Sequence, residues 1–122
     1  MKLTSEIKQS CLIVRLEGEL DHHSAADVRE KIDQMIDTSE RKHLVFSFQG
    51  VTFMDSAGIG VVMGRYNKMK EMGGKVMVSE CSDYAKRILE MSGIFTIAPY
   101  CETVKEAIAI CGQTDLRKNG KE

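Results

Sequence analysis

Short apolar runs and apolar stripes of helical spacing alternate along this chain. The first two runs, at residues 3–8 and 11–17, are separated by two polar residues and predict a β-hairpin. Three later runs, at residues 43–48, 75–79 and 95–97, contain β-branched or aromatic residues and predict single strands. After the hairpin, a segment without a strand pattern therefore separates each expected strand from the next.

Four segments between and after these strands place apolar residues three and four positions apart, which predicts amphipathic helices. Serine or threonine precedes each segment as a possible N-cap, and glycine, which tolerates a left-handed helix terminus, ends three of them. The last segment carries a capping box in which Glu106 follows Thr103 by three residues. The expected boundaries are Ser24 to residues 37–41, Ser56 to Gly73 and Gly74, Ser82 to Gly93, and Thr103 to Gly112.

Strands that alternate with helices predict an α/β domain with a mixed, mostly parallel β-sheet, an N-terminal hairpin and about four helices. We expect one domain over residues 1–112. Because residues 113–122 are polar and lack a period, we expect a flexible charged C-terminal tail there. Its Arg117, Lys118 and Lys121 are expected to be solvated charges rather than a binding patch.

Composition narrows the possible partners and chemistry. The 122 residues suffice for one domain, and 17 basic against 18 acidic side chains argue against direct binding to nucleic acid. The chain has neither an apolar leader nor an apolar segment of membrane-spanning length, so we expect a cytoplasmic protein with no membrane partner. Its cysteines and histidines lack metal-ligand spacing, so we expect no metal and no cofactor. The cysteines, interpreted as free buried thiols, are Cys11, Cys81, Cys101 and Cys111.

Ser56 stands between a strand-like run and the start of a helical pattern. A hydroxyl in this position is expected to cap the helix. The same helix terminus offers unpaired backbone N–H groups and the positive end of the macrodipole, so the fold would tolerate a phosphate on Ser56. From the residues alone, both a plain structural cap and a modified serine are open interpretations.

Two loops are expected to meet near this serine. The turns at residues 19–24 and 52–56 follow the carboxyl ends of strands, where the functional loops of α/β sheets gather. The first turn holds Asp21, which His22 and His23 follow directly. Adjacent histidines beside an acid are typical of a surface pair at a helix start, with proton transfer or metal binding as the alternative.

Three glycines fall within the helix expected after Ser56. Gly58, Gly60 and Gly64 would each cost ~0.8 to 1 kcal/mol relative to alanine, so something should compensate for them. A dinucleotide-binding loop, close packing, and a helix start kept clear for another protein are the alternatives. The spacing departs from the dinucleotide fingerprint, and Asp55 stands where a pyrophosphate would approach. A hydrolase elbow would need glycine where Met54 stands.

The segment from Phe53 to Tyr66, FMDSAGIGVVMGRY, resembles the signature of STAS-domain anti-sigma factor antagonists. The likeness extends to GELDHH at residues 18–23 and MSGIF at residues 91–95, and it covers nearly all of residues 3–112. The GELDHH stretch favours the sporulation branch, the anti-sigma F factor antagonists. A STAS phosphoprotein of a stress-response switch and a small nucleotide-binding protein are the alternatives.

This resemblance implies a partner switch that is not itself an enzyme. In this family the unphosphorylated antagonist binds an anti-sigma factor that is also a serine kinase, and so frees a sigma factor. The kinase then phosphorylates the antagonist and releases it, and a serine phosphatase resets it. Ser56 matches the phosphoacceptor, and Asp21 matches the acidic residue beside it; many members carry a second serine where Ala57 stands here. The implied partner-binding residues are Asp21, Met54, Asp55, Ser56, Ala57, Gly58 and Ile59.

Overall fold

The computed structural model describes residues 1–120, with side chains described through Leu116. Its strands and helices follow the alternation expected from the sequence. In chain order they are β1 (Lys2–Lys8), β2 (Cys11–Leu20), α1 (Ala25–Ser39), β3 (His43–Met54), α2 (Ala57–Glu71), β4 (Val76–Ser79), α3 (Asp83–Ser92), the 3-10 turn η1 (Ile94–Thr96), β5 (Tyr100–Cys101) and α4 (Val104–Gly120).

The five strands form one sheet whose spatial order is the sequence order, β1-β2-β3-β4-β5. β1 and β2 form an antiparallel hairpin, in which Lys8 lies opposite Cys11. The pairs β2 with β3, β3 with β4, and β4 with β5 are parallel, because a helical crossover returns the chain to the same end of the sheet each time. The expected mixed, mostly parallel α/β sheet is confirmed.

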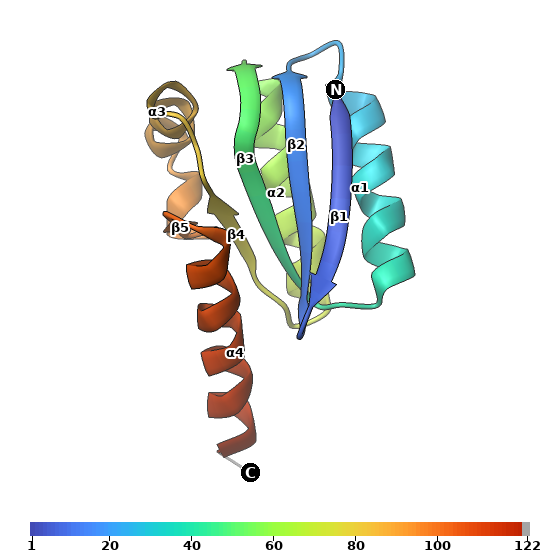
Figure 1. The fold of residues 1–122 in the computed structure, drawn as a ribbon, viewed down its shortest axis with the longest axis vertical. Coiled ribbons are helices and arrows are strands. Elements are labelled where there is room, and N and C mark those ends of the chain that lie inside the picture. Colours follow the sequence, from blue (N-terminus) through green and yellow to red (C-terminus); the bar gives the residue numbers. More distant parts are fainter. Residues whose placement is uncertain (121–122) are drawn as a thin grey trace.

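Helices cover the two faces of the sheet unequally. Leu12, Val14 and Leu16 point to the face that packs against α1 and α2, and the intervening Cys11 and Ile13 point to the other. The second face is covered by α4 alone, through a smaller apolar cluster (Figure 1). This arrangement leaves the carboxyl ends of β2 and β3, at the top of the figure, free of α4.

β2 and β3 extend beyond their apolar runs. The expected strands ended at residues 17 and 48, whereas the observed strands end at Leu20 and Met54. The pairing shifts register near Gly18, whose φ of 117° belongs to a region that favours glycine. Despite these irregularities Leu20 still pairs with Met54, so the loops that follow the two strands start side by side.

The strand expected at residues 95–97 is wrong. Gly93 takes a left-handed conformation with φ of 80° and ends α3, as expected, and the chain then forms η1. Pairing with β4 begins only at Pro99, whose carbonyl accepts a hydrogen bond from Val78 N at 3.1 Å. The fifth strand is therefore β5, which lies on the far side of that proline.

The helix end expected at Gly112 is also wrong, because α4 continues to Gly120. Asp115 explains the continuation. Its carboxylate accepts a hydrogen bond from Ser10 Oγ at 2.6 Å and from His43 Nε2 at 2.9 Å, which anchors a helical turn beyond Gly112. The tail predicted to be flexible is thus helical as far as it is described. The side chains of Arg117, Lys118 and Lys121, expected to be solvated, lie outside the described ones.

Candidate functional site

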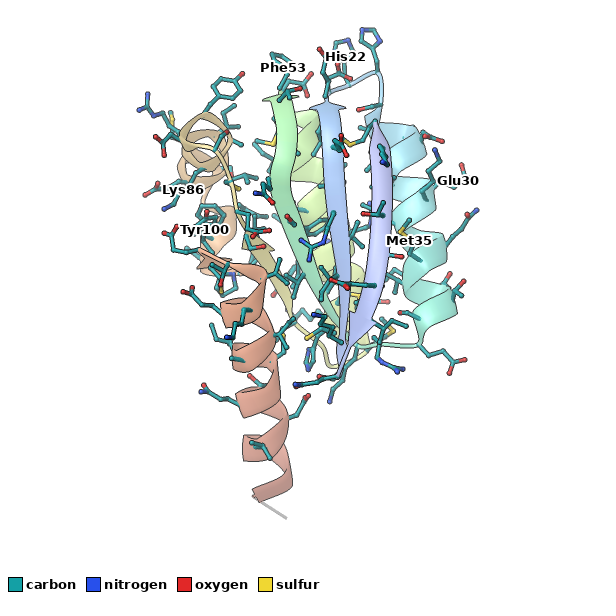
Figure 2. All side chains as sticks on the ribbon, viewed as in Figure 1. His22, Glu30, Met35, Phe53, Lys86 and Tyr100 are labelled. Atoms are coloured by element: carbon teal, nitrogen blue, oxygen red, sulfur yellow. The ribbon has the colours of Figure 1, made fainter. Side chains whose placement is uncertain are left out.

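Two loops meet at the carboxyl ends of β2 and β3. Asp55 N donates to Leu20 O at 3.3 Å, and His22 N donates to Asp55 Oδ2 at 3.1 Å. Figure 2 shows His22 and Phe53 together at this end of the sheet. The predicted proximity of the turns at residues 19–24 and 52–56 is confirmed.

The Ser56 hydroxyl is exposed and makes no hydrogen bond to any described residue. Ser56 occupies the N-cap position of α2 with a helical backbone, φ of -62° and ψ of -17°, whereas a capping side chain needs an extended backbone to fold back. Asp55 caps instead, since its Oδ1 accepts from Ala57 N at 2.8 Å. The expected Ser56 cap is therefore wrong, and its oxygen is available for chemistry.

Both carboxylate oxygens of Asp55 are engaged. Oδ1 accepts the Ala57 amide, and Oδ2 accepts both the backbone amide and the ring Nδ1–H of His22, the latter at 3.0 Å. The ring hydrogen bond from His22, followed by the Ala57 amide, lowers the pKa of the Asp55 carboxyl below its ordinary value. The carboxylate beside Ser56 is therefore charged at neutral pH.

Asp21 forms the turn into α1. Its Oδ1 accepts from His23 N at 2.9 Å and from Ser24 N at 3.0 Å. The hydrogen bond from the Ser24 amide is the largest of several causes that lower the pKa of the Asp21 carboxyl. Ser24 Oγ donates to Glu19 O and accepts from Asp21 N rather than capping α1, so the Ser24 cap expected from the sequence is wrong. Asp21 combines a structural role with a negative charge at the same edge as Asp55.

Met54 and Gly58 lie beneath the surface that was expected to bind a partner. The Met54 side chain is fully buried, and its backbone carbonyl accepts from Tyr84 OH at 3.1 Å. A Cβ on Gly58 would stand 2.6 Å from Met54 Cγ and Sδ and 3.2 Å from Leu20 Cδ2. Close packing therefore accounts for Gly58. Both residues support the surface from below, and contact of either with a partner stays a prediction.

Close packing does not account for the other two glycines. A Cβ on Gly60 or Gly64 would meet nothing within 4 Å. Of the remaining predicted contact residues, Ala57 and Ile59 are half-buried at the rim of the same helix start. Two helical glycines with open space above them leave a low, accessible surface beside Ser56.

One feature of this end was missed in the sequence. Phe53 and Tyr84 are 42% and 52% exposed, and their ring centroids lie 6.3 Å apart. Alternation along β3 could not have revealed Phe53, because Thr52 and Phe53 are both exposed at the end of this strand. Tyr84 could not be linked to it, since α3 approaches only in the folded chain.

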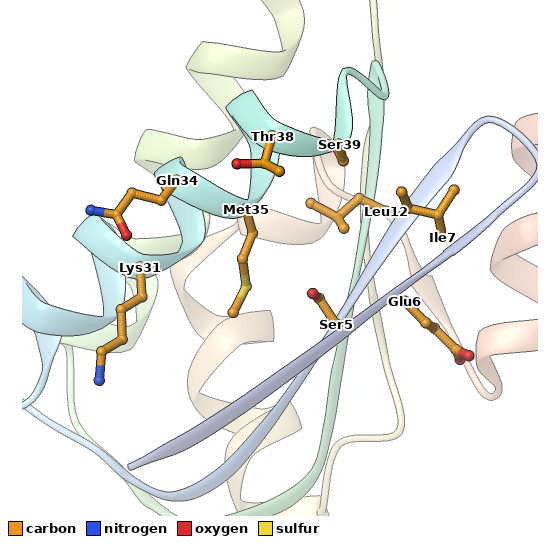
Figure 3. A pocket seen from close by; sticks show the side chains of 9 residues that line it. All are labelled: Ser5, Glu6, Ile7, Leu12, Lys31, Gln34, Met35, Thr38 and Ser39. Carbon is orange, nitrogen blue, oxygen red and sulfur yellow. The ribbon is translucent and has the colours of Figure 1, made fainter.

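Metal ligands, membrane-spanning helices, thiols and other hollows were also sought among the described residues. Among them no three His, Cys, Asp or Glu side chains are grouped to hold a metal ion, and no helix could cross a membrane. Cys11, Cys81, Cys101 and Cys111 are free thiols, and burial raises the pKa of Cys81 to about 12. A hollow of about 530 Å³ lies between β1 and α1, lined in part by Ser5 and Met35, and none of its lining residues belongs to α2 (Figure 3).

Comparison with known proteins agrees with this geometry. The STAS domain family matches residues 2–107. An anti-sigma F factor antagonist of Paenibacillus polymyxa is 38% identical over 108 residues, which are 88% of this chain and 92% of the relative.

Two solved structures of an anti-sigma factor antagonist, SpoIIAA, share the fold. The unphosphorylated form is 29% identical with a TM-score of 0.74, over 88% of this chain and 93% of that chain. The phosphorylated form, from Bacillus, is 28% identical with a TM-score of 0.67, over 88% of this chain and 97% of that chain. Fold, motif and sequence agree, and this chain belongs to the STAS domain family, among the anti-sigma factor antagonists.

Proposed function

We propose that this chain is an anti-sigma factor antagonist whose unphosphorylated form binds an anti-sigma factor through the surface around Ser56. Phosphorylation of Ser56 ends that binding. The observation that carries the proposal is the Ser56 hydroxyl itself, exposed and unbonded at the start of α2. SpoIIAA, with which the chain shares its fold, is known in an unphosphorylated and a phosphorylated form.

The proposed contact surface has a charged side and a small, open side. Asp21 and Asp55 supply carboxylates next to the hydroxyl, and Ala57 and Ile59 form the rim of the helix start. Met54 and Gly58 hold this surface in place from below. Beyond it, Gly60 leaves room for a partner to approach the α2 backbone closely.

Charge explains why phosphorylation would act on binding more than on folding. A phosphate adds about -1.5 to -2 charges at neutral pH, here beside Asp55 and Asp21. Within the chain, the positive end of the α2 dipole offsets ~0.3 to 1 kcal/mol of the repulsion. Across an interface, like charges cost several kcal/mol, and each ~1.4 kcal/mol lowers affinity tenfold. The balance therefore favours release of the partner from an intact domain.

In the proposed reaction this chain supplies only the acceptor. The anti-sigma factor, acting as a serine kinase, would bring ATP, its metal ion and the base that removes the Ser56 proton. A serine phosphatase would restore the hydroxyl. The free thiols favour a reducing compartment, so we place the switch in the cytoplasm.

The sporulation branch is favoured over a stress-response switch by sequence similarity. The anti-sigma F factor antagonist of Paenibacillus polymyxa is 38% identical, whereas an anti-sigma-B factor antagonist of Bacillus subtilis is 28% identical. We therefore assign the cognate partner to the sigma F class.

Calorimetric titration of the unmodified and the Ser56-phosphorylated chain tests the proposal. An anti-sigma F factor and an anti-sigma-B factor serve as alternative partners. We expect binding of the first by the unmodified chain and at least a hundredfold loss on phosphorylation, equivalent to about 3 kcal/mol. Equal affinity of the two forms would overturn the switch, and preference for the anti-sigma-B factor would move the chain to the stress-response branch.

A further inference from the structure

The His22 side chain ties the loop between β2 and α1 to the start of α2. Its ring Nδ1 lies 3.0 Å from Asp55 Oδ2, and its backbone amide lies 3.1 Å from the same oxygen. Two donors from one residue converge on one acceptor, so the carboxylate is held toward the loop. The His22 ring also contacts the ring of His23, with centroids 4.0 Å apart and planes tilted by 40°, and its side chain is 72% exposed.

The hydrogen bond to Asp55 sets the tautomer of His22. A carboxylate only accepts, so Nδ1 carries a proton, and Nε2 is the nitrogen left for another group. Among the described residues Nε2 of His22 has no hydrogen-bond partner. The ring therefore has one nitrogen fixed to the loop beside Ser56 and one nitrogen open to solvent.

Charged residues from two segments lie near this ring. Asp55 bonds it from the start of α2. Asp21 precedes it in the loop and Glu19 lies near the end of β2, and both line a hollow together with Met1, His23 and Ser24. A phosphate on Ser56 would add a further anion next to Asp55. An anion close to an imidazole favours its protonated form, and an imidazolium in turn favours the dianion of a phosphate.

We infer that His22 is a positioning residue of the switch, which holds the Asp55 carboxylate toward the loop and, in its protonated form, supplies a positive charge to a phosphate on Ser56. The inference rests on the proposal that Ser56 is the phosphoacceptor. The adjacent His23 serves as a control, because it has the same chemistry and is likewise exposed but makes no hydrogen bond to Asp55.

A ³¹P NMR titration of the phosphoserine tests this role. Phosphoserine is installed at position 56 by genetic encoding in the unchanged chain and in His22→Gln, His22→Lys and His23→Gln. The phosphate midpoint should rise by about half a pH unit in His22→Gln, an order-of-magnitude effect for losing one unit charge from the neighbouring loop in water. His22→Lys should keep the low midpoint, and His23→Gln should leave it unchanged.

Two results would overturn the inference: equal midpoints in His22→Gln and the unchanged chain, or equal shifts in His22→Gln and His23→Gln. A merely structural role for His22 would not move the midpoint in a folded chain, and far-UV circular dichroism checks the fold of each variant. Because the phosphate is installed during synthesis, the test needs no kinase. Failure of a kinase to modify Ser56 would contradict the proposed function and leave this titration result standing.

Discussion

A histidine and an aspartate pair at each end of the sheet, and the two pairs are built in opposite ways. At the carboxyl ends of β2 and β3, the exposed ring of His22 bonds Asp55 through one nitrogen. At the other end, His43 is fully buried and uses both ring nitrogens. Its Nδ1 accepts from Lys75 N at 2.9 Å, and its Nε2 donates to Asp115 at 2.9 Å.

The pair at the buried end fastens the C-terminal helix to the sheet. Asp115 also accepts from Ser10 Oγ at 2.6 Å and lies 3.3 Å from Lys42 Nζ. The His43 hydrogen bond, followed by that of Ser10, lowers the pKa of Asp115 to about 2. The same residue types thus form a fastening where their hydrogen-bonding groups are satisfied within the chain. At the other end one nitrogen stays open to solvent, which is the basis of the proposed response to a phosphate.

Two serines, one from each end, give the largest expected contrast. Ser56→Ala should abolish incorporation of phosphate by the kinase and leave the melting temperature unchanged, because its hydroxyl bonds to nothing in the described chain. Ser10→Ala should keep full phosphorylation and lose about 1 kcal/mol of stability with its bond to Asp115. Intact-mass spectrometry and thermal melts measure both. Phosphate on the Ser56→Ala chain would place the acceptor elsewhere.

Replacing His43 and His22 in turn should affect stability to different degrees, because only His43 anchors α4 to the sheet. His43→Ala leaves a cavity and strips hydrogen bonds from Lys75 N and Asp115, so we expect a loss of about 2 to 4 kcal/mol in the free energy of unfolding. His22→Ala, at an exposed position, should change it by about 0.5 kcal/mol or less. Urea denaturation provides the comparison. Similar losses in the two variants would remove the distinction between the two ends.

Two glycines of α2 test the surface around Ser56. Gly60→Ala should stabilise the fold by about 0.5 to 1 kcal/mol, because the added methyl group meets nothing within 4 Å and raises helix propensity. It should also weaken partner binding if the open surface serves close approach. Gly58→Ala should instead cost about 1 to 3 kcal/mol through overlap with Met54. Melting and calorimetric titration test the pair, and unaltered binding by Gly60→Ala would exclude Gly60 from the interface.

Lowering the pH should reduce stability slightly, because it protonates the Asp115 carboxylate that bonds His43 and Ser10. The folded pKa of Asp115, about 2, lies below its ordinary value of 3.8. Its contribution to stability is therefore present above pH 4 and disappears as the pH falls from 4 toward 2. Because the carboxylate is partly exposed, we expect a loss of about 1 kcal/mol or less. Urea midpoints between pH 2 and 6 should show a smaller acid-dependent drop in Asp115→Asn, and identical profiles would contradict the assignment.

The capping signals were correct at two of the four expected helices and wrong at Ser24 and Ser56. Ser82 caps α3 as expected, with its hydroxyl accepting from Ala85 N at 3.2 Å. Thr103 Oγ1 likewise accepts from Glu106 N at 3.1 Å at the start of α4. Signals that compete with distant partners misled: Gly112 was expected to end a helix, but the bonds that Asp115 makes with Ser10 and His43 carry α4 onward.

The candidate site likewise combines features that the sequence predicted with features that it did not. Its residues were found from the motif around Ser56, and the meeting of the two loops followed from the parallel sheet. The sequence did not reveal that Asp55 rather than Ser56 caps α2, that Met54 is buried, or that His22 reaches Asp55. The contact of His22 with Asp55 depends on the pairing of Leu20 with Met54, which fixes the two loops relative to each other.

By itself, the sequence determined the alternation of strands and helices, the sheet type and the motif that places a serine at a helix start, because hydrophobic period and motif are properties of neighbouring residues. Only the tertiary structure decided which hydrogen-bonding groups stay unsatisfied. That outcome depends on contacts between residues tens of positions apart, such as His22 with Asp55 and His43 with Asp115. Saturation of those contacts anchors α4 at one end of the sheet, and their incompleteness at the other end underlies the proposed response to a phosphate.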